Sequence, residues 1–121
     1  MTTVLIIDDS PTEAQFVTTM LEQEGYVVDW AIAADKGIKM AKEKKPNVIL
    51  MDVVMPSMSG FQATRRLHKD PETKNIPIIM LTTKDQLSDK AWAKRNGAID
   101  YLVKPPSKSE LIRAIEAALL L

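Results

Sequence analysis

The chain has 121 residues, 45% of them hydrophobic and 26% charged, which is the composition of one ordinary globular domain. Sixteen basic and sixteen acidic residues cancel, so the charge does not predict binding to nucleic acid. The chain has no cysteine, which excludes disulfides and zinc–thiolate sites, and no run of about 20 apolar residues, which excludes a membrane-spanning helix.

The first half of the chain alternates strand-like and helix-like segments. The apolar residues 4–7 predict a strand that ends at Asp8, and because this run is too short for a signal peptide we expect a cytoplasmic protein. Residues 10–13 (Ser-Pro-Thr-Glu) have the pattern of a capping box with proline at the first helical position, and the helix that they open ends at Gly25. The next predicted elements are a strand over 27–31, a helix over 34–43 and a strand over 48–51.

The second half continues the same alternation. Residues 59–62 open a third helix, which ends at Asp70 and Pro71. A strand over 78–81 leads to a helix over 87–96 that is closed by Gly97. The last predicted elements are a strand over 100–103, a second capping box over 107–110, and a helix that buries Leu111, Ile112, Ile115 and Leu119.

Five successive strand–helix units predict an α/β fold with a parallel sheet, because parallel neighbours need a crossover connection between them. Right-handed crossovers place helices on both faces of such a sheet. Of the doubly wound strand orders, the flavodoxin-like order 2-1-3-4-5 puts the first and third strands side by side. We therefore expect a five-stranded, doubly wound parallel sheet with five flanking helices.

Three of the predicted strands end in charged residues. Asp8 and Asp9 follow the first strand, Asp52 follows the third, and Lys104 follows the fifth. In open α/β sheets the carboxyl ends of the strands form one edge, where ligands bind. Carboxylates gathered there repel one another unless cations lie among them, and a hard divalent cation and a lysine ammonium both meet that need. A carboxylate beside Mg2+ and a lysine is suited to taking up a phosphoryl group.

Five segments of the sequence, taken in order, resemble the CheY-like receiver domain of two-component response regulators. They are IIDDS (6–10), LMDVVMP (50–56), SG (59–60), LTT (81–83) and GAIDYLVKP (97–105), and the match covers the whole chain. The resemblance implies a single receiver domain over residues 1–121 with no output domain. Residues 82–105, with TTKDQ and the spaced residues DK-W-KR-GA-DYL-KP, resemble more narrowly the chemotaxis-type regulators of type IV pilus twitching motility.

The resemblance assigns chemical roles to the charged residues. Asp52 is implied as the phosphoacceptor, and Lys104 as the lysine that pairs first with Asp52 and then with a phosphoryl oxygen. The peptide bond between Lys104 and Pro105 is a candidate cis bond. Mg2+ is the implied cofactor, and its implied ligands are Asp8, Asp9, Asp52 and the backbone carbonyl of Val54.

Two further residues are implied as a switch. Thr82 is expected to hydrogen-bond the new phosphoryl group, and Tyr101 to exchange between outward and buried rotamers. The surface that reports phosphorylation is expected to comprise the helix over 87–96, the strand over 100–103 and the last helix. Its partner-binding residues are predicted to be Lys90, Trp92, Lys94, Arg95, Tyr101 and Lys108, a basic and aromatic patch.

These features favour a stand-alone response regulator that acts as a signalling switch and not as an enzyme. The implied partners are a histidine kinase as phosphodonor and a downstream protein, with the pilus motor or a kinase complex as candidate target. We expect no nucleic acid among the partners, no membrane insertion, and a monomer or a weak phosphorylation-dependent dimer.

Three other functions use the same residues. A phosphate sink or phosphorelay intermediate needs the same site, so the sequence does not separate it from an output signal. A Mg2+-dependent phosphohydrolase with an aspartyl-phosphate intermediate is less well supported, because Val54 stands where such enzymes usually carry a second acid. An unphosphorylated scaffold is disfavoured because all the expected site residues are present, namely Asp8, Asp9, Asp52, Thr82 and Lys104.

Overall fold

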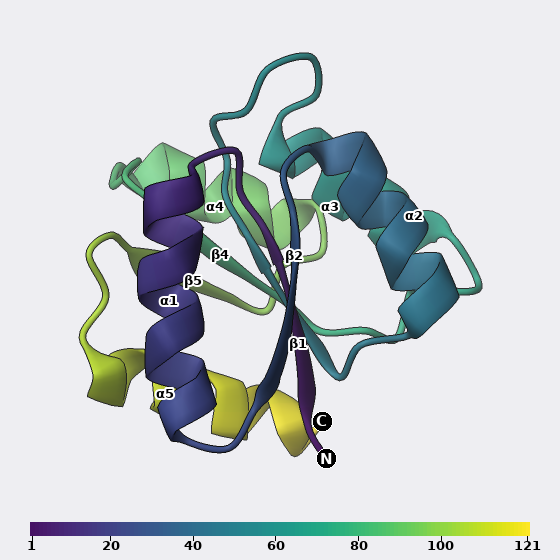
Figure 1. Ribbon diagram of the computed structural model, residues 1–121. Coiled ribbons are helices and arrows are strands. Elements are labelled where there is room, and N and C mark those ends of the chain that lie inside the picture. Colours follow the sequence, from purple (N-terminus) through teal and green to yellow (C-terminus); the bar gives the residue numbers. More distant parts are fainter.

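In the computed structural model, which describes residues 1–121, strands and helices alternate along the whole chain (Figure 1). The strands are β1 (Thr3–Ile7), β2 (Val27–Ala31), β3 (Val48–Met51), β4 (Ile78–Thr82) and β5 (Asp100–Val103). The helices are α1 (Pro11–Gln23), α2 (Ala34–Lys44), α3 (Gly60–Lys69), α4 (Leu87–Arg95) and α5 (Lys108–Leu119). All the predicted elements are confirmed, with ends shifted by one residue at β1, α2, β4 and α4. None of the helices is long and apolar enough to cross a membrane.

The five strands form one parallel sheet in the order β2-β1-β3-β4-β5, which confirms the predicted topology. In the register of this sheet, Ile7 of β1 lies opposite Met51 of β3. The residues that come next in the two strands, Asp8 and Asp52, therefore leave the sheet side by side. Lys104 directly follows β5, at the same edge of the sheet.

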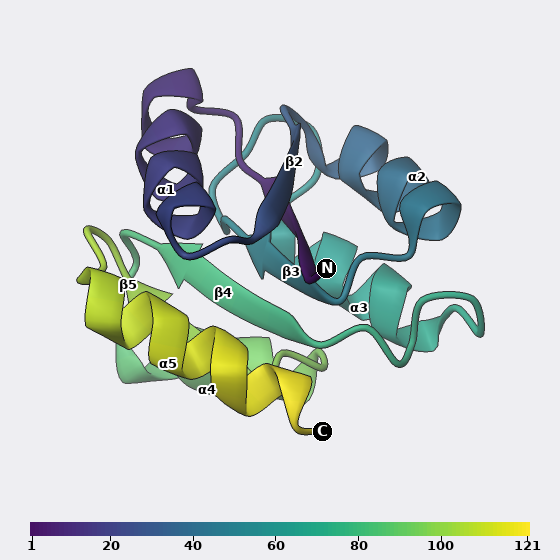
Figure 2. The ribbon, with the colours of Figure 1, turned by 60° about the horizontal axis from the view of Figure 1, so that its bottom comes forward.

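The sheet has a hydrophobic core on each of its faces. Helices α1 and α5 cover one face, and α2, α3 and α4 cover the other. Figures 1 and 2 show α1 and α2 on opposite sides of β1 and β2. Every residue of β3 and β4 is buried, as expected for central strands covered on both faces. Leu119 was predicted to be buried and is exposed instead, because Ala118 occupies the inward position at the end of α5.

Two of the helix starts predicted from the sequence are complete capping boxes, at Ser59 before α3 and at Ser107 before α5. The box predicted at Ser10 is only half formed, which corrects the sequence-based interpretation. The Ser10 hydroxyl accepts a hydrogen bond from the Glu13 N–H (3.3 Å), but the Ser10 N–H donates to Asp8 Oδ1 (2.9 Å). The Glu13 carboxylate is thus not needed at the cap, and it accepts a hydrogen bond from Lys104 instead.

Candidate functional site

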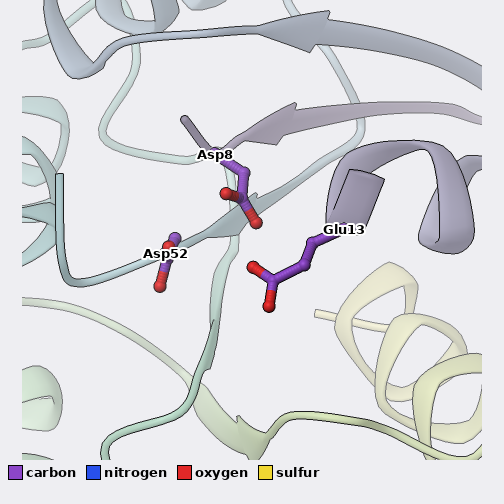
Figure 3. A group of neighbouring side chains, drawn as sticks. All are labelled: Asp8, Glu13 and Asp52. Atoms are coloured by element: carbon purple, nitrogen blue, oxygen red, sulfur yellow. The ribbon is translucent and has the colours of Figure 1, made fainter. Parts of the chain in front are cut away.

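Three carboxylates meet at the carboxyl edge of the sheet. Asp8 and Asp52 come from the ends of β1 and β3, and Glu13 reaches in from the first turn of α1 (Figure 3). One oxygen of each carboxylate lies within 4.8 Å of the others. Asp8 and Asp52 are buried, whereas the Glu13 side chain is about half exposed. Asp8 and Asp52 were predicted from the sequence, whereas Glu13 was not, because the position of Glu13 fits a capping box equally well.

Lys104 supplies the positive charge of this site. Its ammonium donates hydrogen bonds to Asp8 Oδ2 and Glu13 Oε2, each at 2.7 Å, and lies 3.5 Å from Asp52 Oδ2. The Lys104 side chain is only 7% exposed, so these contacts are little screened by water. Of the three distances from the Lys104 ammonium to a carboxylate, the one to Asp52, the predicted partner, is therefore the longest. The Lys104–Pro105 peptide bond is cis, as expected.

The environment makes ionisation of Asp52 costly. Burial raises the pKa of Asp52, and the charge of Asp8 adds to this effect. Three groups lower this pKa: the ammonium of Lys104, the Thr82 hydroxyl, and the Val53 N–H, which donates to Asp52 Oδ1 at 2.8 Å. Their combined effect is smaller, so the pKa of Asp52 stays above its usual value. A further cation beside Asp52 would stabilise the carboxylate that a nucleophile requires.

Lys104 itself remains an ammonium. Desolvation lowers the pKa of Lys104, but the hydrogen bonds to Asp8 and Glu13 and the charge of Asp52 outweigh this effect and raise the pKa overall. Three carboxylates thus surround one ammonium, which leaves an excess of negative charge in a largely buried site. Oxygen ligands and excess negative charge are what a hard divalent cation such as Mg2+ requires, so the residues present fit that ion.

Two residues that the resemblance assigned to the metal lie around this cluster. Asp9 follows Asp8 and is half-buried, but its carboxylate does not belong to the cluster formed by Asp8, Glu13 and Asp52. Val54 lies two residues beyond Asp52 in the loop after β3, and its side chain points outward, with the residue 58% exposed. The roles of Asp9 and of the Val54 carbonyl therefore stay predictions.

The two predicted switch residues are joined through one residue of the loop between β4 and α4. Thr82 is fully buried, and its hydroxyl accepts a hydrogen bond from the Lys84 N–H at 3.5 Å. The Tyr101 hydroxyl donates to the Lys84 carbonyl at 2.8 Å. Burial, with the nearby charges of Asp89 and Asp85, raises the pKa of Tyr101 to about 12. Sequence reasoning missed this link, since both bonds to Lys84 use its backbone and leave no signature in its side chain.

The residues predicted for the partner face do not all lie together in the structure. Lys90, Trp92, Lys94 and Arg95 are all exposed on α4, and Tyr101 is half-buried in the neighbouring strand β5. Lys108, at the start of α5, is directed elsewhere. Its ammonium lies 3.0 Å from the carboxylate of Glu24 and 3.2 Å from the side chain of Gln23, both at the end of α1.

The backbone of Asp8 is fixed by strand β2. The Asp8 N–H donates to the Ala31 carbonyl at 3.1 Å, and the Trp30 indole N–H donates to the Asp8 carbonyl at 2.7 Å. Trp30 is a site residue that the sequence analysis did not single out, because an aromatic residue in a strand is usually explained by packing. Its indole gives the site a natural spectroscopic reporter.

Comparison with known proteins places these observations in a family. The model of the response regulator receiver domain matches residues 4–116. The protein PilH of Pseudomonas aeruginosa is 52% identical over 98% of this chain and 98% of its own length. The solved structure of the chemotaxis protein CheY4 of Vibrio cholerae superposes with a TM-score of 0.92, at 34% identity over 98% of this chain and 99% of that one. A receiver domain of a Pseudomonas aeruginosa sensor histidine kinase, solved with a magnesium ion in its active-site cleft, has a TM-score of 0.91, at 28% identity over 99% of this chain and 98% of that one.

Proposed function

Because this chain belongs to the family of response regulator receiver domains, we propose that it accepts a phosphoryl group on Asp52 from a histidine kinase and thereby changes its affinity for a protein partner. The observation that carries this proposal is the buried Asp52 carboxylate, held 3.5 Å from the Lys104 ammonium inside a cluster of acids. Phosphoryl transfer needs such a positioned oxygen nucleophile beside fixed positive charge.

The transfer exchanges one bond to phosphorus for another. A bond forms between a carboxylate oxygen of Asp52 and the phosphorus, while the bond between phosphorus and the histidine nitrogen of the donor breaks and the imidazole leaves with the bonding electrons. Lys104 then lies within reach of a phosphoryl oxygen, because its ammonium already stands beside Asp52 Oδ2. The new acyl phosphate is the signal, and no other substrate is turned over.

Mg2+ is the proposed cofactor, held by Asp8, Asp9, Asp52 and the Val54 carbonyl. The excess of carboxylates over ammonium groups in the cluster supports a divalent cation there. When bound, Mg2+ supplies positive charge against the phosphoryl oxygens and lessens their repulsion by the acids. The protein's own part is to hold Asp8 and Asp52 side by side through the register of β1 and β3.

The loop between β4 and α4 is the proposed route from the site to the surface. A phosphoryl group adds nearly two negative charges and strong acceptor oxygens. We expect the Thr82 hydroxyl to turn toward these oxygens and so to give up its bond with the Lys84 N–H. Because the Lys84 carbonyl holds Tyr101, movement of this loop would also change the position of Tyr101 beside α4.

The exposed residues of α4 are the proposed docking surface for the partner. Lys90, Lys94 and Arg95 present positive charge around Trp92, which is 46% exposed. Such a basic surface with an aromatic centre fits an acidic segment of a protein. The similarity to PilH over nearly the full length of both chains supports a stand-alone regulator in a chemotaxis-like pathway, with twitching motility as the proposed setting.

Wild-type protein is expected to bind beryllofluoride, a stable mimic of the aspartyl phosphoryl group, only in the presence of Mg2+. In an NMR titration, Mg2+ alone should shift the indole resonance of Trp30, since the indole is bonded to the Asp8 carbonyl. Beryllofluoride with Mg2+ should then shift the amide resonances of Thr82, Lys84 and Tyr101. Removal of Mg2+ with a chelator should reverse both changes.

Three results of the same titration would contradict the proposed function. If Mg2+ and beryllofluoride together shift no resonance near Asp52, the site is not a phosphoacceptor. If beryllofluoride produces the same shifts in the presence of the chelator, the proposed role of Mg2+ is wrong. Shifts that stay confined to the site and do not reach α4 would contradict the route through Lys84.

A further inference from the structure

The contact between Glu13 and Lys104 has no role in the function proposed so far. Glu13 Oε2 lies 2.7 Å from the Lys104 ammonium, as close as Asp8 Oδ2 and closer than Asp52 Oδ2 at 3.5 Å. An N–O distance of 2.7 Å is short even for a charge-assisted hydrogen bond, whereas 3.5 Å is longer than a well-formed one. The ammonium is thus held mainly by Asp8 and by Glu13 on α1, and less closely by the phosphoacceptor.

Glu110, at the same position of another helix, shows that a glutamate there can bond its own helix cap, whereas Glu13 bonds Lys104. Glu13 and Glu110 both occupy the third position of a helix that begins after a serine cap, on α1 and α5. Glu110 accepts a hydrogen bond from the Ser107 N–H at 3.1 Å, which completes its capping box. The equivalent N–H of Ser10 donates to Asp8 Oδ1, so the Glu13 carboxylate makes no bond to the cap and accepts a hydrogen bond from Lys104.

The position of Glu13 makes it a competitor for the lysine. A lysine ammonium has three donor hydrogens, and two of them are directed at Asp8 and Glu13. A phosphoryl group on Asp52 adds acceptor oxygens and negative charge beside the same ammonium, which already lies 3.5 Å from Asp52 Oδ2. The Glu13 side chain is 44% exposed, so it can exchange Lys104 for water at less cost than the buried Asp8 can.

We propose that Glu13 is a positioning residue that holds Lys104 away from Asp52 in the unphosphorylated protein and releases it when Asp52 is phosphorylated. This inference rests on the proposed function, because it concerns the same site. Release leaves the Glu13 carboxylate free at the wall of a cavity of about 360 Å3, which lies between α1 and the loop after β5. Both members of the ion pair line this cavity, so its wall loses a paired contact on phosphorylation. The other lining residues are Thr12, Phe16, Val17, Thr83, Pro105 and Pro106.

Replacing Glu13 by glutamine is expected to tighten beryllofluoride binding about tenfold at saturating Mg2+. The substitution removes one negative charge close to the anionic ligand and one acceptor that competes for Lys104, and a tenfold change corresponds to roughly one such interaction in a partly screened site. The affinity is measured by titration, followed at the Trp30 indole resonance. Glu13→Asp keeps the charge and should return the affinity toward that of wild type.

Glu110→Gln is the matched control, since it makes the same chemical change at the same helix position but far from Lys104. Its beryllofluoride affinity should equal that of wild type. In wild-type protein, beryllofluoride should shift the carboxyl carbon resonance of Glu13 and leave that of Glu110 unchanged. Without any ligand, Glu13→Gln should already shift the resonance of the Lys104 ammonium.

The outcomes separate this inference from the proposed function. If wild type binds beryllofluoride and Glu13→Gln binds it equally well or more weakly, Glu13 does not compete for Lys104, although Asp52 remains the phosphoacceptor. If Glu13→Gln weakens Mg2+ binding more than tenfold, Glu13 is a metal ligand and the inference is overturned. If wild type does not bind beryllofluoride at all, the proposed function is wrong. If the Lys104 resonance of ligand-free Glu13→Gln equals that of wild type, the ion pair between Glu13 and Lys104 does not form in solution, and the inference is overturned.

Discussion

Replacing Asp52 by asparagine is expected to abolish phosphoryl incorporation and, at the same time, to stabilise the unphosphorylated protein. The first effect follows because an amide cannot form the acyl phosphate, and no other carboxylate of the cluster has the same position at the end of β3. The second effect follows because Asp52 is buried beside Asp8, where a carboxylate is costly and a neutral amide is less so.

The direction of this stability change depends on pH. Burial and the charge of Asp8 raise the pKa of Asp52 in the folded protein, so the folded state holds this proton more tightly than the unfolded state does. Ionisation of Asp52 therefore costs nothing at a pH below the pKa that this residue has in the unfolded chain, and the cost grows as the pH rises from that pKa to the higher pKa of the folded protein. Asp52→Asn should be more stable than wild type by about 1 kcal/mol at neutral pH, the low end of the cost of burying a polar group that is not fully compensated, and by nothing at acid pH.

Both effects have direct measurements. Mass spectrometry of the intact protein after incubation with acetyl phosphate and Mg2+ reports phosphoryl incorporation, and urea denaturation without Mg2+ reports the free energy of unfolding. Asp35→Asn, an exposed aspartate in the first turn of α2, is the control and should incorporate phosphoryl like wild type. Incorporation by Asp52→Asn would identify another acceptor, and lower stability at neutral pH would contradict the cost of the buried charge.

The residues that meet in the candidate site were predictable because the site lies at the ends of strands in this fold. Asp8, Asp52 and Lys104 each follow a short apolar run directly, and a parallel sheet brings the ends of such runs to one edge. The position of a residue at a strand end is therefore enough to place it in the site. No distance between side chains has to be known for that conclusion.

The partners of the charged side chains were not predictable in the same way. From the sequence, Glu13 was predicted to complete a capping box with Ser10, and Lys108 was predicted to lie on the partner face with the residues of α4. In the structure Glu13 contacts Lys104 and Lys108 contacts Glu24, because α1 packs beside the loop after β5 and beside the start of α5, which are far from it in sequence. A long charged side chain can reach several partners, and only the packing of the helices decides among them.

The start of α3 contains a constraint that the sequence also does not reveal. Residues 59–60 match the family pattern and a helix start, which explains the serine as a cap but not the glycine. In the structure the Gly60 N–H donates to the Val53 carbonyl at 2.8 Å, so the first turn of α3 lies directly against the backbone that carries Asp52. A Cβ atom at position 60 would overlap the Asp52 carbonyl oxygen and lie 2.8 Å from its carbonyl carbon.

Gly60→Ala is therefore expected to lower the free energy of unfolding by about 3 kcal/mol, the upper range for overpacking, because the atoms in the way are backbone and cannot rotate aside. Phosphoryl incorporation should also fall, since relief of the clash moves Asp52 relative to Lys104. Gly25→Ala is the matched control: nothing lies near a Cβ there, and its positive φ predicts a loss of only about 1 kcal/mol. Urea denaturation of the two variants measures the difference, and equal losses would show that the approach of α3 to Asp52 is looser than these contacts require.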